Sequence, residues 1–409
     1  MRVKPTSAPA PSPAGKTVSR GTWLLLGWAW TVVAAFTVFG ADWLANPLTP
    51  ATALAAFAVL FFTIIAASFG VVHEADHLAH RLGEPYGTLI LTLSIVSIEV
   101  ILIASVLLGR GEFPTIGRDS IFAVMMIIVN LVMGICLIAG GLRHGGQEYN
   151  AQGTKAYLGM MVLLTGMALV LPNHLSGEGE FNTQQAWVIA GLIAALYAVF
   201  LALQMRGERH LFIQPPAGSM TVRGTSPWRA APRETAGNVH RASAEATRGD
   251  AHAEPAHGDG SIIKRSLLLL AMIVPIVLLA HHLAIVIDYG VETAGAPIAV
   301  SGVLIAIIVF TPESLTAVKA ALNNEMQRAI NLCLGAFVST VGLTVPAVLV
   351  IGLVTGKQVV MGISPLETVL LAVTLLLALL SFNGQRTSVI HGAMHLTLFG
   401  VYGFVLFNG

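Results

Sequence analysis

Mostly apolar segments of membrane-spanning length set the strongest limit on how this chain can fold. A helix needs about 20 mostly apolar residues to cross a bilayer. Only 11% of the 409 residues are charged, against roughly a quarter in soluble domains. The sequence therefore predicts an all-α integral membrane protein with about 11 transmembrane helices, at 22–40, 51–72, 86–108, 119–140, 156–172, 185–205, 264–287, 297–319, 328–353, 365–382 and 387–407.

The segments between these spans suggest how the chain is organised. The first residues are basic and rich in Pro, Ala and Ser, which is typical of a disordered tail. A long polar stretch after the sixth span has no apolar core of its own and is expected to be a flexible linker. We predict a cytoplasmic tail, an extra transmembrane helix, a first five-helix repeat, a cytoplasmic linker and a second five-helix repeat, at 1–21, 22–43, 44–205, 206–263 and 264–409.

The distribution of basic residues predicts the orientation of the spans. Short cytoplasmic loops of membrane proteins carry an excess of Lys and Arg. If the N-terminus is cytoplasmic, only Arg110, Arg118 and Lys357 of the 22 basic residues fall outside. We therefore expect a multi-pass protein of the bacterial cytoplasmic (inner) membrane with its N-terminus in the cytoplasm.

Two stretches of the sequence resemble each other. The stretch "GEPYGTLILTLSIVSIEVILIASVLL" (83–108) and the stretch "GAPIAVSGVLIAIIVFTPESLTAVKAAL" (295–322) both open with Gly-x-Pro and contain a single internal glutamate after an apolar run, Glu99 and Glu313. Five spans follow one another in each unit, and an odd number forces the second copy into the membrane in the opposite direction. Inverted repeats of this kind are typical of secondary transporters, which bind their substrate at the repeat interface.

The two glutamates are the strongest candidates for a binding site. An ionised carboxylate near the centre of a bilayer is costly, so such residues are usually functional. Ser97, Thr311 and Ser314 add hydroxyl oxygens nearby, and a site made of hard oxygen ligands suits Ca²⁺. Burial and mutual repulsion also favour the protonated form of a carboxylate. The pair Glu99 and Glu313 is therefore predicted to hold either a cation or protons.

With these two glutamate-containing repeats, the sequence resembles the bacterial calcium/proton antiporters of the cation/calcium exchanger superfamily, which also includes plant and yeast vacuolar exchangers. Within that superfamily it resembles in particular the enterobacterial sodium- and potassium-linked calcium/proton antiporter. The resemblance runs from about residue 51 onward and is most specific in "HLAHRLGEPYGTLILTLSIVSIEV", "TPESLTAVKAALNNEMQRAINL" and "ALYAVFLALQ". It implies one extra helix plus two inverted five-helix repeats, with Glu99 and Glu313 as the principal cation and proton ligands and a polar cluster at Asn324.

The sequence also departs from the family pattern. The family often has Gly-Asn shortly before each glutamate, where this chain has Ile95-Val96 and Val309-Phe310. A glutamine in the helix after the second motif is replaced by Ser339, and Asn130 is the nearest amide in the corresponding helix of the first repeat. Ser339, Asn130 and Asn324 are therefore secondary ligand candidates. The missing amides weaken the case for Ca²⁺ selectivity more than the case for cation/proton exchange.

The stretch "HEADH" at 73–77 fits a zinc-protease pattern, in which two histidines bind the metal and a glutamate acts as base. A catalytic zinc needs a third protein ligand, and no convincing one is present, so an intramembrane protease remains a remote alternative. A second interpretation is a cytoplasmic vestibule that senses pH, because histidine titrates near neutrality. Its candidate residues are His73, Asp76, His77 and His80.

Taken together, these features predict a secondary active antiporter, not an enzyme, that exports Ca²⁺ in exchange for inward-moving H⁺. A monovalent Na⁺ or K⁺/H⁺ antiporter on the same fold is the alternative. No resident cofactor, nucleotide or nucleic acid is expected, the lipid bilayer is the expected environment, and the oligomeric state is left open. His391 and His395, four residues apart in the last span, are expected to hydrogen-bond to neighbouring helices.

Overall fold

The computed structural model describes residues 20–45, 48–82, 86–108, 113–175, 179–215 and 259–408. Side chains are described for all of these except Asp76 and those at 79–82, 86–93 and 259–263. The predicted tail at 1–21 and the predicted linker at 206–263 therefore lie largely outside the described residues.

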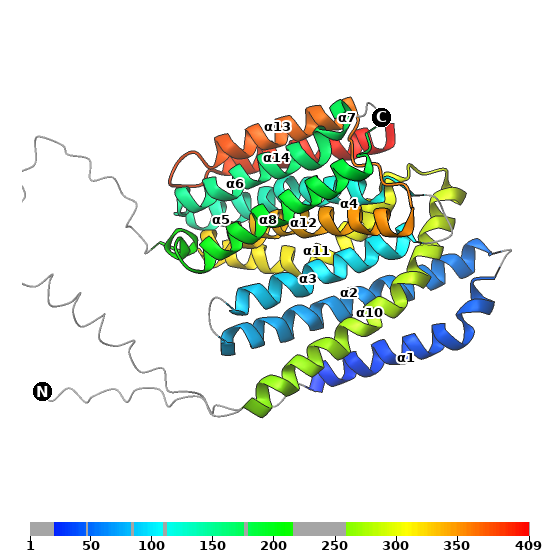
Figure 1. The fold of residues 1–409 in the computed structure, drawn as a ribbon. Helices are drawn as coiled ribbons and strands as arrows, with labels where there is room; N and C mark the ends of the chain where they lie inside the picture. The colour runs from blue at the N-terminus through cyan, green and yellow to red at the C-terminus, as the bar shows by residue number, and fades with distance from the viewer. Residues whose placement is uncertain are drawn as a thin grey trace, which may run out of the picture.

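The described chain is helical almost throughout (Figure 1). Nine of its helices are long and apolar enough to cross a membrane, and two shorter apolar helices cover Ser94–Leu107 and Pro365–Ser381. Each predicted span coincides with one of these eleven, so the all-α membrane architecture is confirmed. The elements are α1 (Arg20–Trp43), α2 (Pro50–Leu82), α3 (Tyr86–Leu107), α4 (Ile116–Met125), the π-helix η1 (Met126–Val132), α5 (Met133–His144), α6 (Ala151–Thr165), the π-helix η2 (Gly166–Val170), α7 (Pro172–Leu175), α8 (Thr183–Met205), the 3₁₀-helix η3 (Arg209–Phe212), α10 (Asp259–Ala294), α11 (Ala299–Leu322), α12 (Met326–Thr355), α13 (Pro365–Ser381) and α14 (Val389–Asn408).

Several helices begin where the sequence supplies a cap. Asn182 and Ser364 precede α8 and α13, and each forms a capping box with the third residue of its helix. Asn150 precedes α6 and accepts two backbone N–H groups of its first turn. Pro365 occupies the first turn of α13, where its missing N–H costs nothing. These caps satisfy backbone donors that would otherwise be left unpaired at the helix ends.

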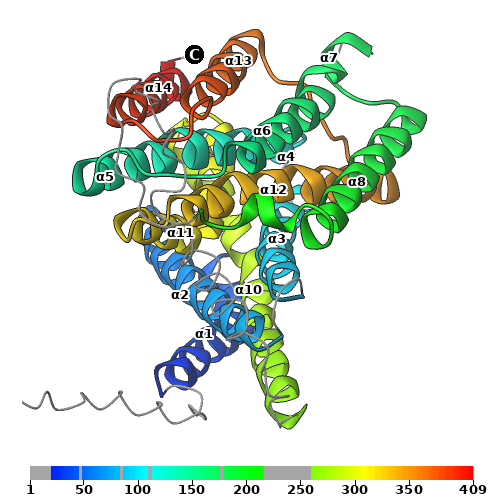
Figure 2. The ribbon, with the colours of Figure 1, turned by 90° about the vertical axis from the view of Figure 1, so that its left-hand side faces the viewer.

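The helices form layers that are clearest in the two ribbon views. α1, α2 and α10 lie together on one side, while α3, α11 and α12 run through the middle (Figure 2). α8 packs against α12 in the same way that α14 packs against α5 and η1. Because α8 and α14 each close one five-helix unit, this equivalence matches the predicted repeat.

Two isolated antiparallel bridges reveal the inverted symmetry directly. Glu148, between α5 and α6, pairs with Arg386, between α13 and α14. Val360, between α12 and α13, pairs with Glu180, between α7 and α8. The first bridge joins the third loop of the first repeat to the fourth loop of the second repeat. The second bridge joins the third loop of the second repeat to the fourth loop of the first, and the two bridges lie at opposite ends of the bundle (Figure 1). The inverted five-helix repeat is therefore confirmed.

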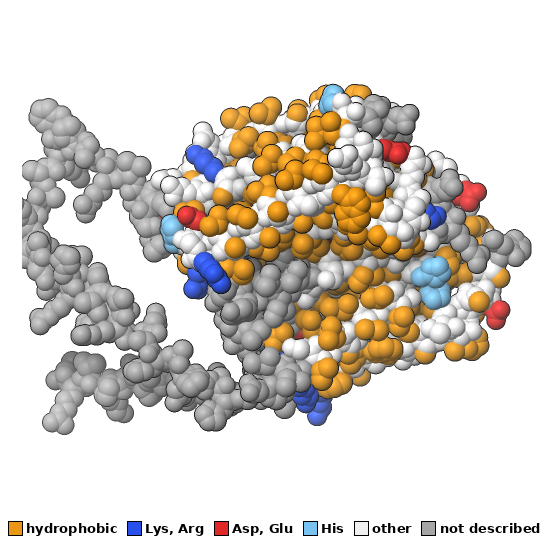
Figure 3. Space-filling model, viewed as in Figure 1, with side chains coloured by type: hydrophobic (Ala, Val, Ile, Leu, Met, Phe, Trp, Pro, Cys, Tyr) orange, Lys and Arg blue, Asp and Glu red, His pale blue; other side chains and the backbone are white. Residues whose placement is uncertain are grey.

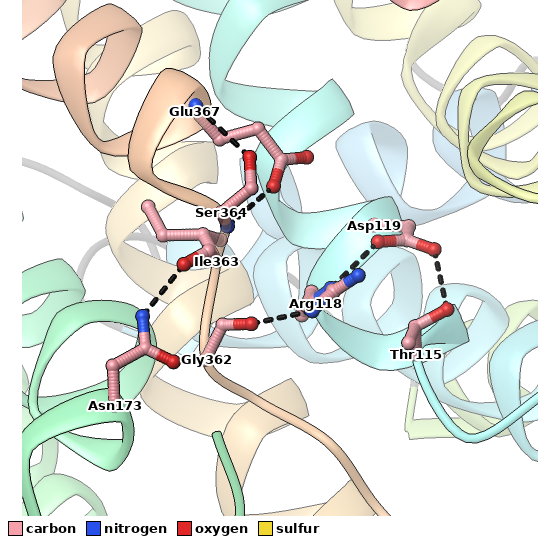
Figure 4. A network of polar contacts seen from close by, with 8 residues as sticks. All are labelled: Thr115, Arg118, Asp119, Asn173, Gly362, Ile363, Ser364 and Glu367. Atoms are coloured by element: carbon pink, nitrogen blue, oxygen red, sulfur yellow. Dashed lines mark hydrogen bonds and ion pairs between the residues drawn. The ribbon is translucent and has the colours of Figure 1, made fainter. Parts of the chain in front are cut away.

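A polar network fixes one of these loops in place (Figure 4). Asp119 at the start of α4 accepts hydrogen bonds from Thr115 at 2.7 Å and from Arg118 at 2.9 Å. Arg118 also donates to the carbonyl of Gly362, and Asn173 of α7 donates to the following carbonyl at 2.6 Å. The loop before α13 is thus tied to two helices of the other repeat.

The outer surface of the bundle suits a lipid environment. In Figure 3 hydrophobic side chains cover the middle of the molecule, and charged side chains gather toward its two ends. Large apolar side chains such as Leu24, Phe62 and Phe404 are more than two-thirds exposed. Helices satisfy their own backbone hydrogen bonds, which is the condition for crossing a bilayer.

Gly302 of α11 allows a close crossing with α4, and this predicts a stability effect. A Cβ at position 302 would lie 2.7 Å from backbone atoms of Asp119 and Ser120. We expect Gly302→Ala to lower the free energy of unfolding in detergent by about 1–3 kcal/mol, the usual cost of overpacking. Gly290→Ala is the matched control because its Cβ would meet nothing within 4 Å. Equal melting temperatures for the Gly302→Ala variant and the parent would contradict this packing.

Candidate cation and proton site

Glu99 and Glu313 come together from the two repeats at the centre of the bundle. Glu99 lies on α3 and Glu313 on α11, and both helices pack against α12 and against each other. The side chains are buried, at 0% and 8% exposure. Both carboxylates therefore lie in the interior that α3, α11 and α12 share. The structure therefore places the two sequence-matched glutamates within one buried region.

Part of this site is satisfied by protein groups and part is not. Thr340 of α12 donates a hydrogen bond of 2.8 Å to Oε2 of Glu99. Thr344 lies one turn further along α12, on the same face as Thr340, and its hydroxyl has no hydrogen-bond partner among the described residues. Oε1 of Glu99 and Oε2 of Glu313 are also buried, and neither has a hydrogen-bond partner in the part of the chain that the structure describes.

These unpartnered oxygen atoms indicate what the site can do. Buried polar atoms in native proteins are nearly always hydrogen-bonded, so each exception calls for an explanation. Carboxylate and hydroxyl oxygens are the ligands of hard cations. A protonated carboxylate needs no cation to neutralise it, whereas an ionised one in this setting does. The site is therefore suited to binding a cation and protons in alternation.

The three hydroxyls predicted beside the glutamates differ in exposure and in hydrogen-bond partner. Ser97 lies on an exposed face of α3, two residues from the buried Glu99. Thr311 donates to the carbonyl of Ile307, and Ser314 donates to that of Phe310 at 2.6 Å. Both hydroxyls thus bond back to their own helix, a common alternative for Ser and Thr.

Ser339 and Asn324 also have other partners. Ser339 donates to the Gly335 carbonyl at 2.8 Å and accepts from Tyr197 of α8 at 2.9 Å. Asn324 sits in the turn after α11 with a φ of 63° and accepts a hydrogen bond from Gln147 at 3.1 Å. The hydroxyl that reaches Glu99 belongs to the residue after Ser339, Thr340.

Asn130 lies in the π-helix η1 and bonds away from the glutamate helices. Its amide donates to Thr374 of α13 at 3.0 Å, and its oxygen lies 2.9 Å from Nδ1 of His395. Nε2 of His395 lies 3.1 Å from the Ser381 hydroxyl. The predicted helix-to-helix bonding is therefore confirmed for His395, while Nδ1 of His391 is buried without a partner among the described residues.

Thr340 and Thr344 were missed as site residues, although the sequence carries a signal for them. They are four residues apart, so they share one face of α12. Both lie between Gly335 and Pro346, in the helix that follows the second glutamate motif. Only the packing of α12 between α3 and α8 decides that this face, and not that of Ser339, meets Glu99.

The HEADH stretch at the end of α2 forms a separate arrangement. Glu74 is buried and makes a 2.9 Å ion pair with Arg265 of α10. This pairing occupies the carboxylate that a zinc protease would need as its base. His73 and His77 are exposed, with ring centroids 4.5 Å apart. Asp76 and His80 were predicted to join them, but their side chains lie outside the described residues.

Comparison with known proteins identifies the family. The model of the family described as "Sodium/calcium exchanger protein" matches residues 52–206 and 265–408. The chain belongs to the sodium/calcium exchanger family. It is 35% identical to the sodium-potassium/proton antiporter ChaA of Escherichia coli over 84% of this chain and 86% of that protein. It is 34% identical to the putative ionic transporter y4hA of Sinorhizobium fredii, over 92% and 94% of the two chains.

Solved structures agree on the fold of this exchanger. The structure of native YfkE superposes with a TM-score of 0.68 at 16% identity and covers 95% of this chain and 100% of that one. The crystal structure of the H⁺/Ca²⁺ exchanger CAX gives a TM-score of 0.63 at 14% identity, over 94% and 89%. The exchanger is thus a multi-pass membrane protein of a cation antiporter family, and its relatives are transporters.

Proposed function

We propose that the exchanger moves Ca²⁺ out of the cytoplasm in exchange for protons that move inward. The observation that carries this proposal is a pair of buried carboxylate oxygens that have no hydrogen-bond partner among the described residues, one each from Glu99 and Glu313 at matching positions of the two repeats. A cation coordinated by both carboxylates satisfies these atoms, and two protons instead neutralise the pair, so that no cation is then needed. Binding of the cation excludes binding of the protons, and this competition is the basis of coupled exchange.

The same chemistry outlines a transport cycle. The cation binds the deprotonated pair while the site is open to the cytoplasm, and rearrangement of the repeats then opens the site to the other side. Release of the cation leaves two carboxylates that take up protons for the return. Protonation removes the charge of the empty site, so the return step avoids moving an uncompensated carboxylate through a low-dielectric region.

The proposed orientation places the N-terminus in the cytoplasm and the protein in the bacterial inner membrane. It rests on the distribution of Lys and Arg, of which only Arg110, Arg118 and Lys357 would lie outside. In this orientation the end of the bundle with the loop between α5 and α6, which contains Gln147, is cytoplasmic. The Asp119 network in Figure 4 then faces outward.

A monovalent substrate is the second candidate. ChaA, the relative at 35% identity, is named as a sodium-potassium/proton antiporter. A relative from Aphanothece halophytica named as a Ca²⁺/H⁺ antiporter is only 23% identical, over 68% of this chain. The family pattern has amides shortly before each glutamate, where this chain has the apolar pairs Ile95-Val96 and Val309-Phe310, so fewer side-chain oxygens are available to a divalent ion. Na⁺ and K⁺ are therefore to be tested beside Ca²⁺.

Everted membrane vesicles with an imposed pH gradient distinguish these candidates. A pH-sensitive dye reports proton release as Ca²⁺, Na⁺ or K⁺ is added to the cytoplasmic face. We expect Ca²⁺ to dissipate the gradient in vesicles that contain the exchanger and not in vesicles without it. If only Na⁺ or K⁺ dissipates the gradient, the monovalent candidate replaces the first. If no cation does so, cation/proton exchange by this chain is contradicted.

Thr340→Val tests the hydroxyl that holds Glu99. The substitution keeps the shape of the side chain but removes the 2.8 Å hydrogen bond. Because a hydrogen bond to a charged group contributes about 1.5–3 kcal/mol, we expect the cation concentration for half-maximal exchange to rise roughly tenfold or more. Ser339→Ala is the control, since that hydroxyl contacts Tyr197 instead. Equal effects of the two substitutions would contradict the assignment of Thr340.

A further inference from the structure

The histidines of the HEADH stretch form a pair that the exchange mechanism does not use. His73 and His77 lie one turn apart on α2, so they share one face of the helix. Their ring centroids are 4.5 Å apart, and both residues are exposed. The spacing brings two imidazole rings within reach of one small ion.

The neighbouring Glu74 is separated from this pair. It is 2% exposed at its side chain and bonds to Arg265 of α10 at 2.9 Å. Glu74 therefore lies in the packed interface of α2 with α10, while His73 and His77 are both exposed. The histidine pair is distinct from the glutamate site, because Glu99 and Glu313 are buried on α3 and α11.

We propose that His73 and His77 together bind one divalent transition-metal ion of the Zn²⁺, Ni²⁺, Co²⁺ or Cu²⁺ class. Imidazole nitrogen is a preferred ligand of these ions, whereas Ca²⁺ prefers oxygen. The exposed position leaves the remaining coordination positions open to water. In the orientation proposed above, the site lies at the cytoplasmic end of α2. It is a binding site for a different class of ion from the one transported.

A second histidine pair in the chain provides a matched comparison. His391 and His395 have the same four-residue spacing on α14. However, His395 is fully buried, and its two ring nitrogens contact Asn130 and Ser381. The two pairs therefore have the same sequence spacing and differ in their exposure to solvent. Only the pair on α2 should bind a metal ion from solution.

Zinc binding to the full-length exchanger in detergent tests this assignment. Isothermal titration compares the parent with His73→Gln, His77→Gln, the double variant and His391→Gln. We expect the double variant to bind one Zn²⁺ fewer than the parent, each single variant to lose the same tight site, and His391→Gln to retain it. All other histidines are present in every variant of the α2 pair, so their contribution cancels. An unchanged number of tight sites in the double variant would overturn the proposal.

Thermal unfolding provides a second readout that does not depend on counting sites. A ligand that binds only the folded state raises the unfolding midpoint. Zn²⁺ should raise the midpoint of the parent and of His391→Gln more than that of the double variant. Equal Zn²⁺ shifts in the parent and the double variant would also overturn the proposal.

Discussion

Glu313→Gln should abolish cation-driven proton movement, and Glu99→Gln should do the same. Glutamine keeps the size of the side chain but can neither carry a negative charge nor exchange a proton. Losing a buried interaction of a charged group costs about 3 kcal/mol or more, which corresponds to an exchange rate at least about 100-fold lower. Initial rates of cation-dependent proton release in everted vesicles, normalised to the amount of exchanger, measure the effect.

Two comparisons make this prediction specific. Glu292→Gln removes a carboxylate from an exposed position of α10 and should leave the rate unchanged. Glu313→Asp retains a titratable carboxylate but shortens it, so partial activity is expected. Exchange at the parental rate by either Gln variant would contradict a mechanism in which both carboxylates alternate between cation and protons.

Arg265→Met should destabilise the protein strongly, and by more than Gly302→Ala does. The guanidinium of Arg265 pairs with Glu74 at 2.9 Å, and the two side chains are 8% and 2% exposed. Removing one partner leaves a buried carboxylate uncompensated, which costs about 3–5 kcal/mol. A fall in the unfolding midpoint of the detergent-solubilised protein measures the effect.

The double variant Glu74→Met with Arg265→Met separates loss of the pair from loss of packing. Replacing both members of a buried ion pair with apolar residues is often neutral or stabilising, so we expect most of the lost stability to return. Arg386→Met is the contrasting control. It pairs with Glu148 at 2.8 Å, but Arg386 is 51% exposed, and exposed pairs contribute about 1 kcal/mol or less. A double variant as unstable as Arg265→Met would contradict the ion-pair explanation.

The membrane spans and the repeat could be predicted because both depend on local patterns. Membrane-length apolar runs specify helices without reference to their neighbours. The matched positions of Glu99 and Glu313 then indicated the inverted arrangement, which the bridges Glu148–Arg386 and Glu180–Val360 confirm. These predictions needed only the order and spacing of residues.

The partners of the site could not be predicted in the same way. Ser339 and Thr340 are adjacent in sequence, and only the packing of α12 decides which one meets Glu99. Asn130 matched a ligand position by order, but in the structure it bonds to His395, 265 residues away. Glu74 was assigned a possible catalytic role, and its ion pair with Arg265 depends on the packing of α2 on α10. Each outcome depends on contacts between distant segments.

Proton release on cation binding tests the central claim most directly. Purified exchanger in a weakly buffered detergent solution is mixed with saturating Ca²⁺, Na⁺ or K⁺, and a pH indicator counts the protons released. If the cation and protons share Glu99 and Glu313, the transported cation should release protons from the parent and none from the Glu99→Gln, Glu313→Gln double variant. Equal proton release from the parent and the double variant would contradict the shared site, as would cation binding to the parent without proton release.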